Sequence, residues 1–219
     1  MTKSILCFGD SNVWGAIPGA FNPETGLSGR RIKAKRWTGI LQSNLGAAYN
    51  VIEDGISART TNLDEIVPGR PYKNGFTQLP VSLETHYPID LVLLWLGTND
   101  VKVQYNRSAD DIVKAMRSLA EFVLSSNKGC HGNAPKVMIV AAPAAIEATN
   151  PHPQYNEASL QKTRMLAGLY QQLAADLGCE FFDAGSVATA SIVDGVHLDD
   201  PACEAIGKAL ADKIKQMEL

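Results

Sequence analysis

The stretch Leu91-Val92-Leu93-Leu94-Trp95-Leu96 is apolar throughout and is followed at once by Gly97-Thr98-Asn99-Asp100. A strand with one solvated face alternates apolar and polar residues, whereas a strand covered on both faces does not. The stretch is therefore typical of a central strand in a parallel sheet, and the four residues after it mark the end of that strand. Residues 136–141 show the same uninterrupted apolar pattern.

Further apolar runs bring the expected number of strands to five, at residues 4–9, 49–53, 90–96, 136–141 and 180–183. Helical patterns, with apolar residues recurring about every 3.6 positions, fall between or after them at residues 37–45, 108–126, 156–177 and 201–217. This alternation predicts an α/β fold, in which helices cover both faces of a parallel sheet. Two stretches, 16–35 and 142–155, are rich in Gly or Pro and are expected to be irregular loops around a site or contacts to another subunit.

The composition narrows the class of protein. The chain has 219 residues, 45% of them apolar, and a net charge of −3, which suits one domain spanning residues 1–219. No basic excess points to nucleic acid or to an anionic membrane as a partner. The four cysteines form no C-x-x-C pair, so no metal site is expected. No apolar segment has the length of a secretory signal or a membrane span, so the expected location is the cytoplasm.

Four short blocks carry the polar chemistry. Gly9-Asp10-Ser11 follows the first predicted strand, Asp54-Gly55 the second, and Gly97-Thr98-Asn99-Asp100 the third, while Asp194-Gly195-Val196-His197 lies in a late loop. Ligands of such sheets bind beyond the carboxyl ends of the strands. The first three blocks should therefore share one edge of the sheet.

These blocks contain the groups that acyl transfer through a serine requires. Ser11 is a candidate nucleophile, His197 a base with an ordinary pKa of about 6.5, and Asp194 a carboxylate that can orient it. Gly55 can offer a backbone N–H and Asn99 a side-chain N–H to an oxyanion. Each block also has a simpler structural interpretation. Ser11 and Asn99 can be helix caps, and the blocks at Gly55 and at Asp194 can be ordinary turns. His152, between two prolines, is a rival base or a residue of the pocket wall.

The ordered set of blocks resembles the SGNH (GDSL) hydrolase superfamily over nearly the whole chain. Longer segments look like its bacterial arylesterase/acyltransferase branch: GDSNVWG at 9–15, RWTG at 36–39, EDGISARTT at 53–61 and FFDAGS at 181–186. The resemblance implies Ser11 as nucleophile, His197 as base and Asp194 as its orienting acid, with an oxyanion hole from Ser11, Gly55 and Asn99. It also implies a three-layer α/β/α fold with a flavodoxin-like five-stranded parallel sheet, no cofactor, and a homo-oligomer.

The resulting hypothesis is a serine esterase that hydrolyses short-chain, acetyl-type carboxylic esters through an acyl-enzyme. Related proteins suggest that the acyl group can also pass to alcohols or peroxide. Possible walls of the substrate pocket are Trp14, Ala58, Ile146, His152, Ile192 and Val193. A carbohydrate acetyl esterase, or a lysophospholipase or thioesterase of the same superfamily, remains an alternative. A nucleotide or flavin binder is disfavoured because neither G-x-G-x-x-G nor G-x-x-x-x-G-K-[ST] occurs.

Overall fold

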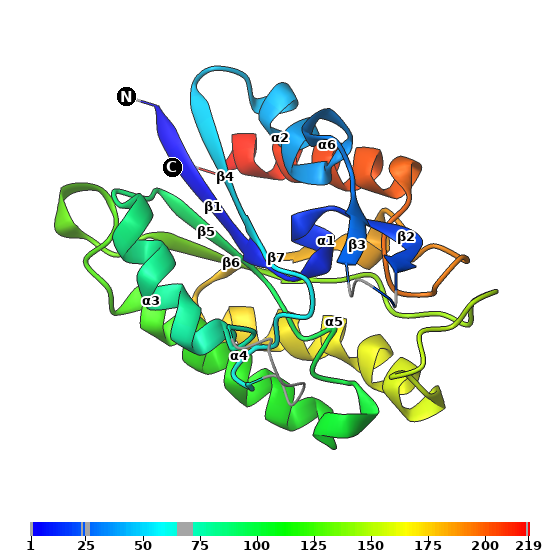
Figure 1. The fold of residues 1–219 in the computed structure, drawn as a ribbon. Coiled ribbons are helices and arrows are strands. Elements are labelled where there is room, and N and C mark those ends of the chain that lie inside the picture. The colour runs from blue at the N-terminus through cyan, green and yellow to red at the C-terminus, as the bar shows by residue number, and fades with distance from the viewer. Residues whose placement is uncertain (1, 23, 25–26, 65–71, 218) are drawn as a thin grey trace.

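A computed structural model describes residues 2–22, 24, 27–64, 72–217 and 219, and its centre is a five-stranded sheet (Figure 1). The strands run in the spatial order β4-β1-β5-β6-β7, and all neighbouring pairs are parallel. Their bounds are β1 Lys3–Gly9, β4 Tyr49–Gly55, β5 Leu91–Trp95, β6 Lys136–Ala141 and β7 Glu180–Asp183. The five strands expected from the apolar runs are thus confirmed, with boundaries shifted by at most two residues.

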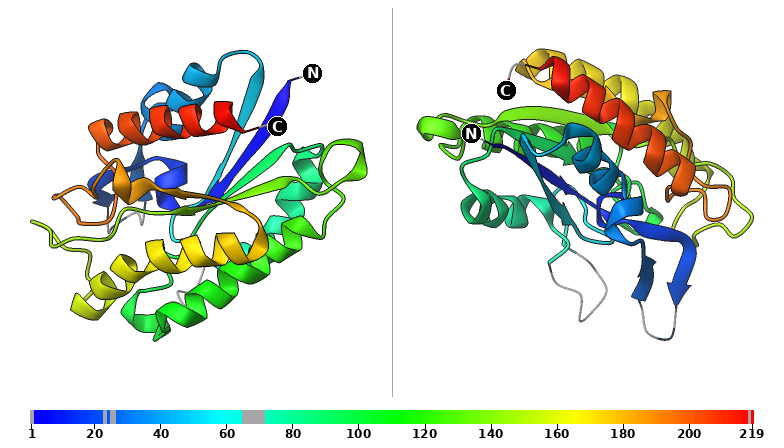
Figure 2. Two further views of the ribbon diagram at one scale, coloured as in Figure 1. Left: turned by 180° about the vertical axis from the view of Figure 1, so that it is seen from behind. Right: turned by 90° about the horizontal axis from the view of Figure 1, so that it is seen from above.

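Helices cover both faces of this sheet. Helices α2 (Trp37–Leu45) and α6 (Asp200–Gln216) lie side by side on one face, and α3 (Gly75–His86), α4 (Ala109–Leu124) and α5 (Glu157–Leu177) lie on the other (Figures 1 and 2). Four of these five helices were expected from the sequence. The exception is α3, which contains Pro80 and begins where the Asn74 side chain accepts the N–H groups of Phe76 and Thr77.

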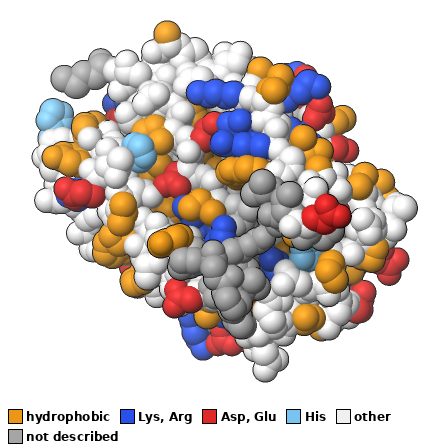
Figure 3. Space-filling model, viewed as in Figure 1, with side chains coloured by type: hydrophobic (Ala, Val, Ile, Leu, Met, Phe, Trp, Pro, Cys, Tyr) orange, Lys and Arg blue, Asp and Glu red, His pale blue; other side chains and the backbone are white. Residues whose placement is uncertain are grey.

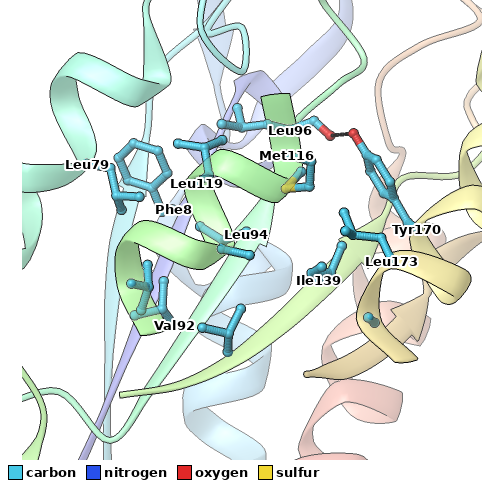
Figure 4. Close-up of a cluster of buried hydrophobic side chains, with 14 of the residues drawn as sticks. Phe8, Leu79, Val92, Leu94, Leu96, Met116, Leu119, Ile139, Tyr170 and Leu173 are labelled. Carbon is cyan, nitrogen blue, oxygen red and sulfur yellow. Dashed lines mark hydrogen bonds between the residues drawn. The ribbon is translucent and has the colours of Figure 1, made fainter. Parts of the chain in front are cut away.

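The uninterrupted apolar strands separate two cores. Alternate side chains of β5 point to opposite faces, so Leu91 and Leu93 join the core under α2 and α6, while Val92 and Leu94 join the core under α3, α4 and α5. Figure 4 shows the second core, in which Phe8 of β1 packs among Leu and Val side chains. At its far end the Tyr170 hydroxyl donates a hydrogen bond of 3.1 Å to the Leu96 carbonyl.

Residues 16–35 are more ordered than the sequence suggests. They form an antiparallel hairpin, β2 (Ala16–Asn22) and β3 (Leu27–Arg30), followed by the 3₁₀ turn η1 (Lys33–Lys35). The expectation of an irregular loop was therefore wrong here, whereas residues 142–155 contain no helix or strand. Lys and Arg side chains gather on the surface near α2 and η1 (Figure 3). Arg31, at the base of the hairpin, is buried instead.

The order of the strands fixes where a site can form. The chain runs from β1 outward to β4 at the edge of the sheet and then returns past β1 to build β5, β6 and β7 on the other side. The strand order reverses between β1 and β5. In open α/β sheets this reversal point, at the carboxyl ends of the strands, is where ligands bind.

Candidate active site

Ser11 lies where β1 ends. It is the first residue of the four-residue helix α1 (Ser11–Trp14), and the side chain of Asp10 caps this helix by accepting the Asn12 N–H at 2.9 Å. The abrupt change from strand to helix places the Ser11 hydroxyl beyond the sheet edge, where 7% of the residue is exposed.

The hydroxyl of Ser11 meets the imidazole of His197. Ser11 Oγ lies 3.0 Å from His197 Nε2, and His197 Nδ1 lies 2.7 Å from Asp194 Oδ2. The carboxylate can only accept at this contact, so Nδ1 carries the proton and Nε2 is free to accept from the serine hydroxyl. The structure therefore brings together the three residues that the sequence singled out as nucleophile, base and acid.

The carboxylate of Asp194 is held on several sides. Its Oδ1 accepts the backbone N–H groups of Val196 and His197 at 3.1 and 3.0 Å, and its Oδ2 accepts that of Gly19 at 2.9 Å. Burial raises the pKa of Asp194, but the hydrogen bond and charge of His197, together with the backbone donors, outweigh burial and hold the pKa well below its usual range. Asp194 is therefore ionised at neutral pH.

Backbone and side-chain contacts fix the loop that carries His197. The Ile146 N–H donates to the Gly195 carbonyl at 2.9 Å, and the Ser191 N–H donates to the His197 carbonyl at 2.8 Å. Buried Arg31 donates from Nη2 to the Leu198 carbonyl at 2.6 Å and also reaches the Ala16 carbonyl. The sequence did not single out Arg31, because its partners are backbone carbonyls that no motif displays.

Asn99 follows β5 and is 5% exposed. Its Nδ2 donates to the Arg59 carbonyl at 3.0 Å. An amide nitrogen carries two N–H bonds, so this contact fixes the plane of the group and leaves its second N–H for another acceptor.

Gly55 ends β4 directly opposite Gly9 in the parallel register. The next residue, Ile56, donates its N–H to the Gly9 carbonyl at 3.1 Å. Successive backbone N–H groups of a strand point to opposite sides, so the Gly55 N–H points away from β1. A Cβ at residue 55 would lie 2.2 Å from the Trp14 backbone nitrogen, which explains a glycine at this position through close packing against α1.

The turn after β4 contains a residue of unusual conformation. The Arg59 N–H donates to the Ile56 carbonyl at 3.1 Å and closes a four-residue turn, whose third residue, Ala58, has φ 66°. Non-glycine residues in the left-handed region are uncommon and gather at functional sites. Among the described residues, the Ala58 N–H has no hydrogen-bond acceptor.

The other residues suggested as pocket walls are scattered over several elements. Trp14 ends α1 beneath the guanidinium of Arg30, 5.1 Å from the ring centroid. Ile146 lines a cavity of about 270 Å³ between the loop after β6 and α5, and neither Ser11 nor His197 lines this cavity. Ile192 and Val193 are 62% and 42% exposed, on the loop before Asp194.

His152 is half-buried against Tyr155, with ring centroids 5.4 Å apart. Its Nδ1 accepts the Gln154 N–H at 3.2 Å, whereas the serine hydroxyl is in contact with His197. Burial, with the charges of Lys102 and His197, lowers the pKa of His152 to about 4. The ring is therefore neutral at physiological pH, and its hydrogen-bonding geometry does not favour it as the base.

Asp10 is a buried acid beside the nucleophile. One oxygen caps α1, and the other has no hydrogen-bond partner among the described residues. Burial, opposed by the Asn12 N–H and the charges of His197 and Lys102, raises the pKa of Asp10 to about 6. Sequence reasoning passed over Asp10 and Lys102 because burial of a charged group is not visible in a sequence.

Comparisons with known proteins show the family and fold of the chain. The sequence profile of the GDSL-like Lipase/Acylhydrolase family matches residues 7–205. An aryl esterase from M. smegmatis is 42% identical, with a TM-score of 0.88 over 98% of this chain and 99% of that one. A carbohydrate acetylesterase from Sinorhizobium meliloti is 39% identical, with a TM-score of 0.88 over the same shares of the two chains. No curated protein sequence matches this chain.

The chain belongs to the GDSL-like lipase/acylhydrolase family. It is an esterase with the SGNH hydrolase fold, and a small-molecule ester is its class of substrate. None of the helices in the described part of the chain has the length and apolar character to span a membrane.

Proposed function

We propose that this esterase hydrolyses short-chain carboxylic esters through a covalent acyl-Ser11 intermediate. The observation that carries the proposal is the continuous contact from Ser11 Oγ to His197 Nε2 and from His197 Nδ1 to Asp194, at 3.0 and 2.7 Å. A serine hydroxyl is a weak nucleophile, and a base within hydrogen-bond reach activates it.

The reaction takes place in two steps. Ser11 Oγ attacks the ester carbonyl carbon as His197 Nε2 takes the hydroxyl proton, and a tetrahedral oxyanion forms. The C–O bond to the alcohol then breaks, and His197 returns the proton to the leaving oxygen. Water next attacks the acyl-enzyme with His197 again as base, which releases the carboxylic acid and restores Ser11. Ionised Asp194 stabilises the imidazolium in both steps.

Three donors stabilise the oxyanion in this proposal. Two are the Ser11 N–H and the Asn99 side chain, as expected from the sequence. We assign the third to the backbone N–H of Ala58 rather than Gly55. The support is the register at Gly55, the left-handed conformation of Ala58, and the absence of an acceptor for its N–H among the described residues. Loss of one such donor typically costs about 10²–10³ in kcat.

A short acyl group is favoured by the confined position of the nucleophile. Ser11, Asn99 and Asp194 are each less than one-tenth exposed. Small esters, such as acetates, can reach the Ser11 oxygen with the least rearrangement. A purified-enzyme series from acetyl to octanoyl esters of one alcohol tests this, and we expect kcat/KM to fall with chain length. Equal turnover of the octanoyl ester contradicts a restricted pocket.

Labelling tests the nucleophile. A serine-reactive phosphonate should abolish activity and add one adduct at Ser11, located by mass spectrometry of peptides. The matched variant Ser11→Ala should show neither labelling nor turnover. An adduct at another residue, with activity lost, contradicts the assignment.

A sugar acetate is the second candidate substrate. Its support is the similarity to the carbohydrate acetylesterase from Sinorhizobium meliloti. Comparing kcat/KM on acetylated sugars with that on phenyl acetate separates the two substrates. Adding an alcohol, or peroxide, to the same assay measures transfer of the acyl group to acceptors other than water.

We also propose that the chain forms a homo-oligomer. Ile17 and Phe21 of the hairpin are 38% and 54% exposed, and Ile192 and Val193 are exposed on the loop that contacts the hairpin through Gly19 and Asp194. Exposed apolar side chains that gather in one region favour association. Light scattering coupled to size-exclusion chromatography gives the mass directly, and a monomer at micromolar concentration contradicts this proposal.

A further inference from the structure

Arg59 is a buried cation that none of the steps above uses. Its residue is 1% exposed, and its guanidinium lies over the ring of Phe8, 4.0 Å from the centroid. Nη1 donates to the carbonyls of Gly9 and Asp54 at 3.0 and 2.7 Å, and Nη2 pairs with Asp54 Oδ1 at 2.9 Å. One side chain thus joins the carboxyl ends of two neighbouring strands, β1 and β4.

Both carbonyls belong to backbone that leads into the site. The Gly9 carbonyl is two residues before Ser11, and the Asp54 carbonyl precedes the turn that holds Ala58. A hydrogen bond to a carbonyl fixes the plane of its peptide group, because the peptide is rigid. Arg59 therefore sets the direction in which the chain leaves each strand.

The backbone of Arg59 forms hydrogen bonds in the segments of the other two proposed oxyanion donors, Ala58 and Asn99. Its N–H closes the turn from Ile56 that holds Ala58 in the left-handed conformation. Its carbonyl accepts Nδ2 of Asn99 and so orients that amide. Side chain and backbone of one residue together contact all three segments that supply oxyanion donors.

Burying the charge of Arg59 costs folding free energy, which argues for a role beyond stability. Burial lowers the pKa of Arg59 against the opposing charge of Asp54, and Nε has no hydrogen-bond partner among the described residues. Well-packed apolar residues often replace buried ion pairs without loss of stability. A guanidinium is needed here because it reaches two carbonyls and a carboxylate at fixed angles.

We infer that Arg59 is a positioning residue that aligns the oxyanion-binding donors of Ser11, Ala58 and Asn99. This inference rests on the proposed function, since it presumes acyl transfer at Ser11. Arg59 is 1% exposed and acts through the peptide groups and the amide that it holds.

The main test replaces Arg59 with lysine, which keeps the charge and loses the fork of donors. The control is Arg36→Lys, because Arg36 is an arginine less buried than Arg59 that also pairs with a carboxylate, Glu53, and donates no hydrogen bond to Gly9, Asp54 or Asn99. Active sites are counted by phosphonate labelling, so that kcat refers to folded, labelled enzyme. We expect Arg59→Lys to lower kcat by about 10²-fold with KM within about threefold, and Arg36→Lys to leave both within about threefold of the wild type.

Two further measurements separate positioning from stability. An oxyanion hole discriminates between an aryl acetate and its thiono analogue, in which sulfur replaces the carbonyl oxygen, so the preference for oxygen should fall in Arg59→Lys and not in Arg36→Lys. The double variant Arg59→Lys with Asn99→Ala should lose less activity than the product of the two single losses, because both changes act on the same group of oxyanion donors. If Arg59→Lys does not fold, Asp54→Asn is the second variant, because it weakens the ion pair that holds the Arg59 guanidinium. It should show the same fall in the preference for the aryl acetate over its thiono analogue.

The outcomes are distinct from those that test the proposed function. An unchanged kcat per labelled site, or an unchanged oxygen preference, overturns the role of Arg59 and leaves acyl transfer at Ser11 intact. Labelling at a residue other than Ser11 in the wild type overturns the proposed function itself.

Discussion

The backbone N–H of Gly19 donates to Asp194 Oδ2 at 2.9 Å, the same oxygen that lies 2.7 Å from Nδ1 of His197. Gly19 belongs to strand β2 of the exposed hairpin, 175 positions away from Asp194 in the sequence. An element outside the main sheet therefore takes part in holding the Asp194 carboxylate in place.

Gly19→Ala should disturb this contact. Gly19 has φ +71°, and an added Cβ would lie 2.7 Å from Cγ1 of Val193, next to Asp194. We expect kcat to fall by about tenfold with little change in KM, since 1.4 kcal/mol of lost orientation corresponds to that factor. Gly46→Ala is the control, because Gly46 has φ +76° and no atom within 4 Å of an added Cβ. An equal loss of activity in both variants would show that the hairpin contact is unimportant.

Asp194→Asn should leave the fold intact and remove most of the activity. The Asn carboxamide can keep one acceptor, but if its N–H₂ faces His197 the ring proton moves to Nε2, where it blocks acceptance of the Ser11 proton. We expect kcat to fall by about 10⁴-fold, with little change in the far-ultraviolet circular dichroism spectrum. Retention of a tenth of the activity would mean that Asp194 does not orient the base.

His152 should make the stability of the protein depend on acidity. Its pKa falls from the ordinary 6.5 to about 4 in the folded chain, so the unfolded chain binds more protons between these values. The free energy of unfolding should therefore fall as the pH drops from 6.5 towards 4. Urea titrations across this range should show a shallower decline in His152→Gln. Parallel curves for the two proteins would contradict the low pKa.

Asp10 should have the opposite pH dependence. Its pKa rises from the ordinary 3.8 to about 6, so the folded chain binds more protons between these values, and its contribution to stability is lost as the pH rises through 6. Asp10→Asn keeps an oxygen that can cap α1 and removes the buried charge. Its melting temperature should exceed that of the wild type at pH 8, with the difference shrinking towards pH 4. A lower melting temperature at pH 8 would show that the charge is stabilised by its surroundings.

The sequence was sufficient for the sheet and for the residues that meet at its edge. Strands buried on both faces leave unbroken apolar runs, and polar blocks directly after such runs must share the carboxyl edge. Ser11, Asp194 and His197 could be named because their side-chain types are specific to the chemistry. The family resemblance added the expected order and role of each block.

The features that the sequence did not reveal depend on backbone geometry or on tertiary contacts. Helix α3 carries Pro80 and a weak apolar pattern, and the hairpin strands β2 and β3 are too exposed to show the pattern of a buried strand. The direction of the Gly55 N–H follows from a register that only strand pairing defines. Arg59 lies within a segment that matched the family, yet its partners are carbonyl oxygens, which every residue possesses.

The separation of Ser11 and His197 by 186 positions has a consequence for biosynthesis. During synthesis Ser11 emerges from the ribosome 186 positions ahead of His197. The nascent polypeptide therefore holds Ser11 without its partner His197 until β7 has been added and the following loop has docked. Under the proposed mechanism, we expect a nascent chain to show no esterase activity until the segments that carry Ser11 and His197 have folded together.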